Sequence, residues 1–398
     1  MSTTDRLHAL DGVRGFALIL GIFFHGAAGY VENFPAALWP MREPSSTTLG
    51  LLFFVSHMFR MSLFIFIAGF FGRMLIERKG TAGFVRDRAK RILLPLVAGL
   101  PVVLLALGLL GGLGFLLSGM SVADLQRLQT PPPGTPTPRG AFPWAHLWFL
   151  YYLLLFYGGA LIVRAIGRAV DPGGRVVAVL DAVVRFCLSG VWGAAAIGLP
   201  LAAYFYSLEG WSSWTGLPAP LVFLPHLPSV VGYGTAFAAG WLAHRQVDRV
   251  LALERRWLAF LVAAVALTVV CLWLGGLTPR FEAYLENRTL LWYTAAYLVG
   301  TWCWTFGLIG CAVRYLSAPS PRRRYLADSS YFLYLMHLPV LALFAAWWNP
   351  LPWHWTIKYP LQIVATLVVL LLSYNYLVRS TLIGATLNGR RYPRRLAA

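Results

Sequence analysis

The first apolar segment carries an arginine and a histidine at a spacing that places both on one helix face. It reads LDGVRGFALILGIFFHGAAGY, with Arg14 near its start and His25 eleven positions later. At 100° per residue this spacing leaves about 20° of offset, and the two residues lie about 16 Å apart along the axis. A neutral imidazole is a suitable general base at physiological pH. His25 is therefore a candidate catalytic base; the alternative is that both residues are interfacial anchors.

The second apolar segment, VSHMFRMSLFIFIAGFFGRM, places His57 and Arg60 about one helical turn apart. A charged side chain in the middle of a lipid-facing helix costs about 2.5–3.5 kcal/mol on insertion scales. An arginine can lessen this cost by extending to the interface. A histidine one turn away favours a polar pocket instead, so we interpret the pair as lining a site inside the protein.

Two further segments contribute histidines. In YLADSSYFLYLMHLPVLALF, His337 lies in the middle of the run and Pro339 follows it, and a proline tends to kink a helix. The alternative for His337 is a buried ring bonded to a carbonyl group. In WAHLWFLYYL, His146 and Trp148 stand at the start of an apolar run. They are candidate substrate contacts, and an ordinary interfacial position is the alternative.

The basic stretch 73–91 contains RDRAKRILLP, where Arg88 and Arg91 lie three positions apart shortly before Pro95. Seven of its nineteen residues are Lys or Arg. Arginine binds phosphate groups bidentately, which makes the pair a candidate phosphate site. Charge that only fixes the topology is the alternative. We expect the stretch to be a loop outside the membrane.

These residues belong to a chain of 398 residues that is 58% hydrophobic and only 12% charged. Soluble domains carry about 25% charged residues, so lipid is the expected solvent. The net charge of +18 would indicate nucleic acid in a soluble protein, but here it follows from topology and we expect no nucleic-acid partner. None of the four cysteines is in a CxxC pair, so neither a disulfide framework nor a zinc site is indicated, and we expect no metal. They are Cys187, Cys271, Cys303 and Cys311.

Ten apolar runs are long enough to cross a bilayer, which takes about 20 helical residues. The start, MSTTDRLHALDGVRG, lacks the features of a signal peptide, so we expect the first run to be retained. The sequence predicts an all-α, polytopic membrane protein with one domain over 1–398. The predicted spans are 11–30, 47–76, 92–117, 144–165, 184–206, 222–244, 257–277, 289–315, 326–348 and 358–380.

Basic residues are distributed unevenly between the two sides of this topology. With both termini in the cytoplasm, 26 of the 33 Lys and Arg residues fall on that side, as the positive-inside rule requires. The Pro-rich segment 118–143 is then an outer loop, and 381–398 is a basic cytoplasmic tail. The topology also predicts one polar cavity in the outer half of the membrane, lined by His25, His57, Arg60, His146 and His337.

Five strings resemble segments of the membrane acyltransferase family often called acyltransferase-3, in family order over residues 6–380. They are LDGVRGFALILGIFFH, HMFRMSLFIFIAGFFG, RDRAKRILLPL, HLWFLYYLLLF and SSYFLYLMHLPV. HMFRM and HLWFL are most similar to the branch of glucan-biosynthesis C proteins, which succinylate periplasmic glucans. Many members carry an appended soluble esterase-like domain. This sequence departs from that pattern, so we expect acceptor specificity to come from the helices and outer loops.

The resemblance implies transfer of an acyl group, succinyl or acetyl, from cytoplasmic acyl-CoA to a hydroxyl of a periplasmic or extracellular glycan at a bacterial inner membrane. The family's catalytic histidine corresponds to His25, and the arginine of that motif to Arg14. The Arg-x-x-Arg pair that handles the CoA donor corresponds to Arg88 and Arg91. The expected partners are the glycan or glycoside acceptor, membrane lipid and glycan-biosynthesis proteins. Further active-site residues implied by the resemblance are Arg60, His57 and His337.

In the expected mechanism, neutral His25 removes the acceptor proton as the hydroxyl attacks the thioester. Arg60 stabilises the oxyanion, with His57 or His337 as a second hydrogen-bond donor. Two other interpretations stay open. In a proton-coupled transporter the buried His and Arg residues would mark an ion path, although this leaves the paired arginines unexplained. A structural scaffold for glycan synthesis is the third.

Overall fold

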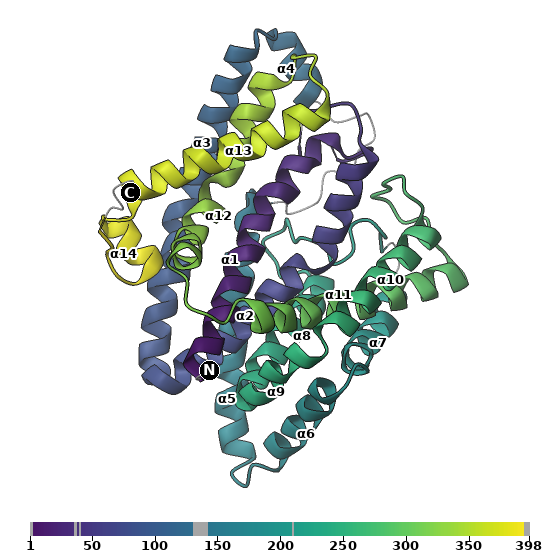
Figure 1. The fold of residues 1–398 in the computed structure, drawn as a ribbon, viewed down its shortest axis with the longest axis vertical. Helices are drawn as coiled ribbons and strands as arrows, with labels where there is room; N and C mark the ends of the chain where they lie inside the picture. Colours follow the sequence, from purple (N-terminus) through teal and green to yellow (C-terminus); the bar gives the residue numbers. More distant parts are fainter. Residues whose placement is uncertain (1–2, 36–37, 40, 130–141, 209–210, 394–398) are drawn as a thin grey trace.

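The computed structural model describes residues 3–35, 38–39, 41–129, 142–208 and 211–393 (Figure 1). Fourteen α-helices and no β-strand form within these ranges, which confirms the predicted all-α class. The α-helices are α1 (Thr3–Ala27), α2 (Thr47–Arg88), α3 (Leu94–Ser118), α4 (Val122–Gln129), α5 (Trp148–Val170), α6 (Arg175–Ser189), α7 (Gly193–Tyr206), α8 (Leu227–Ala243), α9 (Val247–Leu251), α10 (Trp257–Gly275), α11 (Asn287–Tyr315), α12 (Pro321–Trp348), α13 (Trp355–Ser373) and α14 (Leu382–Asn388). Shorter elements are the 3₁₀ segments η1 (Ala28–Tyr30), η3 (Ala145–Leu147), η4 (His244–Gln246) and η5 (Ala252–Arg255), and the π-helices η2 (Ala89–Leu93) and η6 (Tyr374–Val378).

Seven helical stretches in the described part of the chain are long and apolar enough to cross a membrane. A bent pair, α6 and α7, with 111° between its halves, makes eight if it counts as one span. The expected number of ten is therefore not reproduced by length and composition alone. The expected span 222–244 corresponds to α8, which has 17 residues. The seven are Ala9–Tyr30, Thr47–Ser118, Ala145–Val170, Trp257–Gly275, Asn287–Tyr315, Pro321–Trp348 and Trp355–Val378.

The stretch Thr47–Ser118 joins two of the expected spans without a loop between them. Its 72 residues would measure about 108 Å as one straight helix, far more than the roughly 30 Å of the hydrocarbon core. The path breaks at Gly80, whose φ of 67° is left-handed, and it passes through the π-helix η2 before α3. The expected loop 73–91 was therefore wrong. Its Arg, Lys and Ala residues favour helix, and only Gly80 departs from helical geometry.

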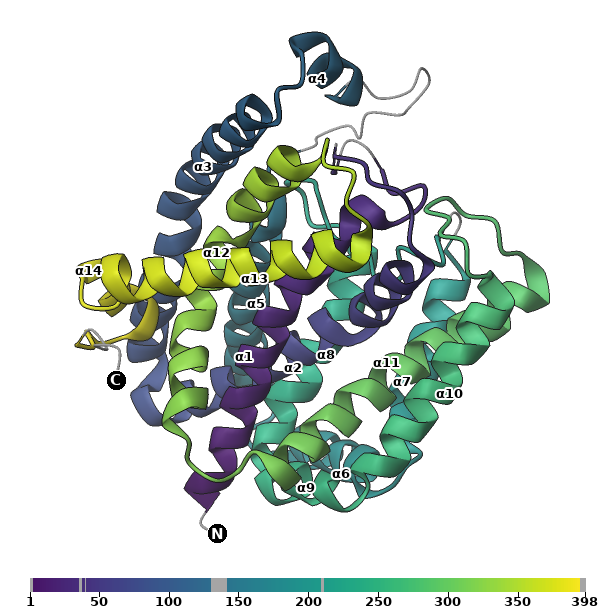
Figure 2. The same ribbon diagram turned by 45° about the horizontal axis from the view of Figure 1, so that its top comes forward.

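Helix α1 lies in the centre of the bundle and packs against α2, α11 and α12 (Figure 1). Helix α3 runs along α12, and α13 crosses α12 and α1 (Figure 2). On the other side of α1, α2 packs on α8, and α11 packs between α7 and α10. Glycines allow the closest of these approaches, since a Cβ on Gly69 of α2 would meet the Phe237 carbonyl oxygen of α8 and a Cβ on Gly240 would meet that of Phe66.

The start of α1, the end of α2 and the start of α12 share one end of the bundle, which we call the basic face. It carries Arg14, Arg88, Arg91, Arg323 and Arg324. At the opposite end, the predicted outer loop 118–143 forms helix over Val122–Gln129, and 130–141 lies outside the described residues.

A buried ion pair ties the chain together at that opposite end. Lys358 Nζ of α13 lies 2.7 Å from a Glu43 carboxylate oxygen, and both side chains are less than a tenth exposed. Asn349 donates to the Arg42 carbonyl oxygen at 2.8 Å. Burial raises the pKa of Glu43 above its ordinary value, and the hydrogen bonds from Lys358 and Asn349 oppose this shift.

Candidate active site

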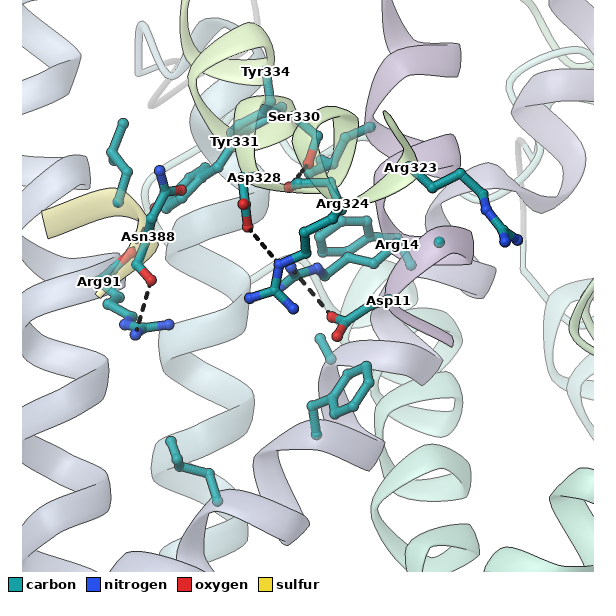
Figure 3. A pocket seen from close by; sticks show the side chains of 18 of the residues that line it. Asp11, Arg14, Arg91, Arg323, Arg324, Asp328, Ser330, Tyr331, Tyr334 and Asn388 are labelled. Atoms are coloured by element: carbon teal, nitrogen blue, oxygen red, sulfur yellow. Dashed lines mark hydrogen bonds and ion pairs between the residues drawn. The ribbon is translucent and has the colours of Figure 1, made fainter. Parts of the chain in front are cut away.

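A cavity of about 700 Å³ lies at the basic face, between α1, α2, α5, α12 and the C-terminal segment. Guanidinium groups dominate its mouth, and Figure 3 shows four of them. The predicted phosphate pair, Arg88 and Arg91, lies here. So does Arg14, which the sequence analysis grouped with His25. Six arginines among the described residues line the cavity: Arg14, Arg88, Arg91, Arg323, Arg324 and Arg390.

Carboxylates orient several of these arginines. Asp87, whose side chain is 8% exposed, accepts from Arg88 at 2.7 Å and from Lys79 at 2.8 Å, and lies 3.8 Å from Arg91. This role of Asp87 was not among the sequence predictions, although its place between arginines in RDRAKR was a usable signal.

Two more carboxylates pair with arginines at the mouth. Asp11 lies 3.3 Å from Arg14, and Asp328 lies 3.2 Å from Arg324 (Figure 3). The six arginines still outnumber these carboxylates. The mouth therefore has an excess of positive charge that suits phosphate groups.

Away from the mouth the cavity becomes apolar and aromatic. Phe64 of α2 and Phe149 and Leu153 of α5 line this part, together with Tyr331 and Tyr334 of α12. The Tyr331 hydroxyl donates to the Arg91 carbonyl oxygen at 2.6 Å, so α12 is tied to the π-helix η2, which carries Arg91 directly after Arg88 at the end of α2. A cationic mouth followed by an apolar interior suits an elongated ligand with an anionic end.

Three imidazoles from three different elements meet next to the apolar end of this cavity. They are His25 of α1, His146 of η3 and His337 of α12. Ring centroids are 5.2 Å apart for His25 and His337, 4.7 Å for His146 and His337, and 6.4 Å for His25 and His146. Tyr334 lines the cavity and has its ring 5.1 Å from that of His146. The histidine cluster therefore lies next to the cavity at Tyr334.

Hydrogen bonds assign the protons of two histidines. A ring nitrogen that faces a carbonyl oxygen must carry hydrogen, because a carbonyl only accepts. His337 Nδ1 lies 2.7 Å from the Tyr334 carbonyl oxygen, and His57 Nε2 lies 2.6 Å from that of Thr215. In their neutral forms His337 Nε2 and His57 Nδ1 therefore offer lone pairs, and both are buried without a partner among the described residues. The free nitrogen of each ring accepts in the neutral form, so donation to an oxyanion by His57 or His337 requires the protonated ring.

His25 and His146 have free nitrogens. Both nitrogens of buried His146 lack a partner within the described residues. The half-buried ring of His25 receives no hydrogen bond from them either, so no carboxylate orients it. Among the described residues no group of three or more His, Cys, Asp or Glu side chains is arranged to hold a metal ion.

Arg60 points into the bundle and not to an interface. Its guanidinium carbon lies 4.4 Å from the centroid of the Phe24 ring, the residue before His25, and a Cβ on Gly21 would lie 3.1 Å from Arg60 Nη1. The other neighbour of the Phe24 ring is His57, whose ring stacks on it with 5.4 Å between centroids. No carboxylate of the described chain pairs with Arg60, which leaves an unpaired cation beside the cluster.

The structure places His25, His146 and His337 together, with Arg60 and His57 next to the Phe24 ring that precedes His25. None of these five residues lines the cavity at the basic face, so a single polar cavity lined by all of them stays a prediction. Trp148 is not part of this cluster, because its side chain is buried against Tyr233 with 5.5 Å between the ring centroids. Several cavity residues were not among the predicted site residues. They are Tyr334, which lies next to the histidine cluster, and part of the mouth: Arg323, Arg324, Asp328, Asn388 and Arg390.

Comparison with known proteins identifies the family of the chain. The acyltransferase-3 family, described as an acyltransferase domain, matches residues 7–375. The chain is also 30% identical over 103 residues to the glucans biosynthesis protein C of Escherichia coli strain K12 and to that of strain SMS-3-5. This alignment covers 25% of the chain and 26% of the relative, so the chain matches about a quarter of the relatives' length. No solved structure matches the chain. Because the family match extends over nearly all of the sequence, the protein belongs to the acyltransferase-3 family of membrane acyltransferases.

Proposed function

We propose that the protein transfers an acyl group from cytoplasmic acyl-CoA to a hydroxyl of a glycan on the outer side of a bacterial inner membrane. The observation that carries this proposal is the adjacency of two dissimilar sites. The arginine-lined cavity, which suits the phosphates of CoA, includes Tyr334 in its lining, and the His146 ring of the histidine cluster lies 5.1 Å from the Tyr334 ring. A thioester at the apolar end of the cavity would reach His25 without leaving the protein.

The proposed topology has ten crossings with both termini in the cytoplasm. Thr47–Ser118 counts twice because of its length, and the bent pair α6–α7 and the short α8 each count once. The basic face then lies in the cytoplasm, where the positive-inside rule expects 26 of the 33 Lys and Arg residues. The cytoplasm is also where acyl-CoA is available, so cavity and donor are on the same side.

The chemistry assigned to the cluster uses His25 as a general base. Its free imidazole nitrogen takes the proton of the acceptor hydroxyl while the oxygen attacks the thioester carbonyl. Arg60, which has no carboxylate partner in the described chain, stabilises the negative charge that develops on the carbonyl oxygen. The carbon–sulfur bond then breaks, and the proton on His25 passes to the CoA thiolate. His337 presents a lone pair to the cluster, so it holds this proton between His25 and the thiolate.

The identities of the acyl group and of the acceptor are proposed on narrower grounds. The relatives are named for glucan biosynthesis, which supports a glucan or related glycan as acceptor and contact with glycan-biosynthesis proteins. Succinyl and acetyl are the two acyl groups we propose to test. The unpaired Arg60 near the reaction centre is compatible with the extra carboxylate of succinyl.

The test uses purified protein in lipid vesicles with acyl-CoA labelled in the acyl group and a glucan acceptor. We expect labelled glucan and free CoA thiol from the wild type, and a rate lowered about 10²–10⁴-fold in His25→Ala. His354→Asn is the matched control, because exposed His354 caps α13 far from the cluster and asparagine caps equally well. Label carried into the vesicles without thiol release would support the transporter instead. Wild-type rates in correctly folded His25→Ala would remove the proposed mechanism.

A further inference from the structure

The chain after the last long apolar helix folds back onto the cavity mouth. It leaves η6, forms α14, and continues without regular secondary structure through Pro393. Helix α14 packs against η2 and α12, the two elements that border the mouth. Leu387, Asn388 and Arg390 line the cavity itself. The sequence analysis expected only a basic tail here. We call residues 379–393 the C-terminal wall.

Arg379 anchors this wall from inside. Its side chain is buried at 6% exposure, and its guanidinium lies 5.0 Å from the ring centroids of Tyr325 and Tyr392 and 5.9 Å from that of Tyr374. It also donates to the Pro393 carbonyl oxygen at 2.8 Å. An arginine enclosed by three aromatic rings gains both packing and cation–π energy. Arg379 therefore holds the two ends of the wall against η6 and α12.

The wall meets the phosphate pair at its turn. Arg91 Nη2 donates to the Asn388 carbonyl oxygen at 3.3 Å (Figure 3). The Asn388 side chain in turn donates to the Tyr374 hydroxyl at 2.8 Å. The next residue, Gly389, has a φ of 81° and ends α14 in the left-handed region. A Cβ at Gly389 would also overlap the Arg91 guanidinium, so a larger residue there would strain the turn and displace the end of the Arg91 side chain.

The turn after Gly389 directs Arg390 toward the same cavity as Arg91. The Arg390 side chain lies over the Tyr392 ring at 4.6 Å, and the Tyr392 hydroxyl accepts from Arg324 at 3.3 Å. Arg91, Arg324 and Arg390 therefore surround one part of the mouth, with Asp328 as the nearby carboxylate. Such a cluster has more positive charge than its acidic neighbours neutralise, and an anionic ligand relieves the repulsion.

We propose that the C-terminal wall is part of the donor site, with Arg390 as a ligand of the CoA phosphates and Arg379 as the positioning residue that holds the wall in place. The proposal rests on the proposed function, since it takes acyl-CoA as the donor. It adds that donor binding requires the C-terminal wall, a segment that follows the last long apolar helix and is distant in sequence from Arg14 of α1.

Steady-state kinetics test the role of Arg390. We expect Arg390→Gln to raise KM for acyl-CoA about tenfold, the loss of one charge-assisted hydrogen bond, with kcat unchanged. Arg391→Gln is the control, because this substitution removes the same charge from the neighbouring residue. Arg391 is exposed and does not line the cavity. For Arg379, the Gln variant should raise KM as well, and Lys should restore part of the loss since it keeps the cation between the rings. Equal KM values for Arg390→Gln and Arg391→Gln would overturn the assignment.

Hydrogen exchange separates this inference from the proposed function. The probe is CoA added to wild-type protein in phosphatidylcholine nanodiscs. Slower exchange in both 86–93 and 382–393 supports the wall as part of the donor site. Slower exchange in 86–93 alone leaves the donor cavity in place and overturns the wall. No change in either overturns the donor site itself. Protection that needs anionic lipid and not CoA would assign the wall to a lipid headgroup and also contradict the proposal.

Discussion

The Tyr334 hydroxyl donates a hydrogen bond of 2.8 Å to the main-chain carbonyl oxygen of His146, while the Tyr334 ring forms part of the cavity lining. One side chain thus belongs to both sites. It fixes η3, and with it the His146 ring, relative to α12, which carries His337. A ligand that enters from the basic face meets this phenol immediately before it meets the imidazoles. Tyr334 therefore controls how the two sites are aligned.

Removing the Tyr334 hydroxyl should disturb this alignment and little else. In Tyr334→Phe the ring stays, but the His146 carbonyl loses a buried hydrogen bond worth about 1 kcal/mol. We expect kcat for acyl transfer to fall about five- to tenfold while KM for acyl-CoA stays constant. Tyr151→Phe is a matched control, because Tyr151 makes the same kind of bond to the Phe223 carbonyl oxygen at 2.8 Å, on the exposed side of α5. A change of equal size in both variants would contradict a specific role for Tyr334.

Arg60 is expected to act in the transition state. Replacing it with Gln removes the only cation that we assign to the oxyanion, and loss of one such donor typically costs 10²–10³ in kcat. Arg60→Lys keeps the charge and should retain more activity. Single-turnover kinetics distinguish the chemical step from binding. Arg280→Gln serves as the control, since it removes a cation–π contact of 4.8 Å with Tyr284 away from the cluster. If Arg60→Gln raised only the KM of the acceptor, Arg60 would be a binding residue.

Asp87 should affect donor binding without touching the donor. Its carboxylate holds Arg88, Arg91 and Lys79, so Asp87→Asn frees these side chains and removes their shared orientation. We expect a rise of several-fold in KM for acyl-CoA that becomes smaller at high salt, because screening weakens the phosphate contacts in both proteins. Asp181→Asn is the control, as Asp181 makes an equally close pair with Arg245 outside the cavity. An unchanged KM in Asp87→Asn would show that the arginines need no such orientation.

The buried pair of Glu43 and Lys358 is predicted to stabilise the fold and to make it sensitive to pH. Lys358→Met leaves Glu43 buried without its cation, a loss of about 3–5 kcal/mol, while the double variant with Glu43→Gln should recover most of it. Burial already raises the pKa of Glu43, and losing Lys358 raises it further. A carboxyl whose pKa is raised in the folded state stabilises that state at low pH, and this contribution is lost as pH rises through the raised value.

Thermal unfolding between pH 4 and pH 8 measures this effect. The difference in Tm between wild type and Lys358→Met should be small at pH 4 and grow toward pH 8. The double variant should show no such growth, because it has no titrating group at this position. A Lys358→Met variant whose Tm deficit shrank as pH rose would contradict the assignment of the charge to Glu43.

The amino-acid sequence alone determined that lipid is the expected solvent of this protein and which residues have a high free-energy cost of insertion into it. Apolar runs of about 20 residues can satisfy their backbone in lipid only as helices, so an all-α membrane protein followed directly. His25, His57, Arg60 and His337 stood out because ionisable groups in such runs need a reason to be there. The alternation of basic segments predicted a common depth for them, and the structure places these four side chains near one another and near His146.

Only the tertiary structure decided how those residues divide between two sites. Helical periodicity put Arg14 and His25 on one face, but it said nothing about which neighbours cover each end of that face. The packing of α12 and α5 assigns Arg14 to the cavity mouth and His25 to the histidine cluster, with Tyr334 between them. Long-range contacts likewise bring Arg390 beside Arg91, about 300 residues away in sequence. No local pattern encodes such a meeting, because it depends on how α14 folds back over η2.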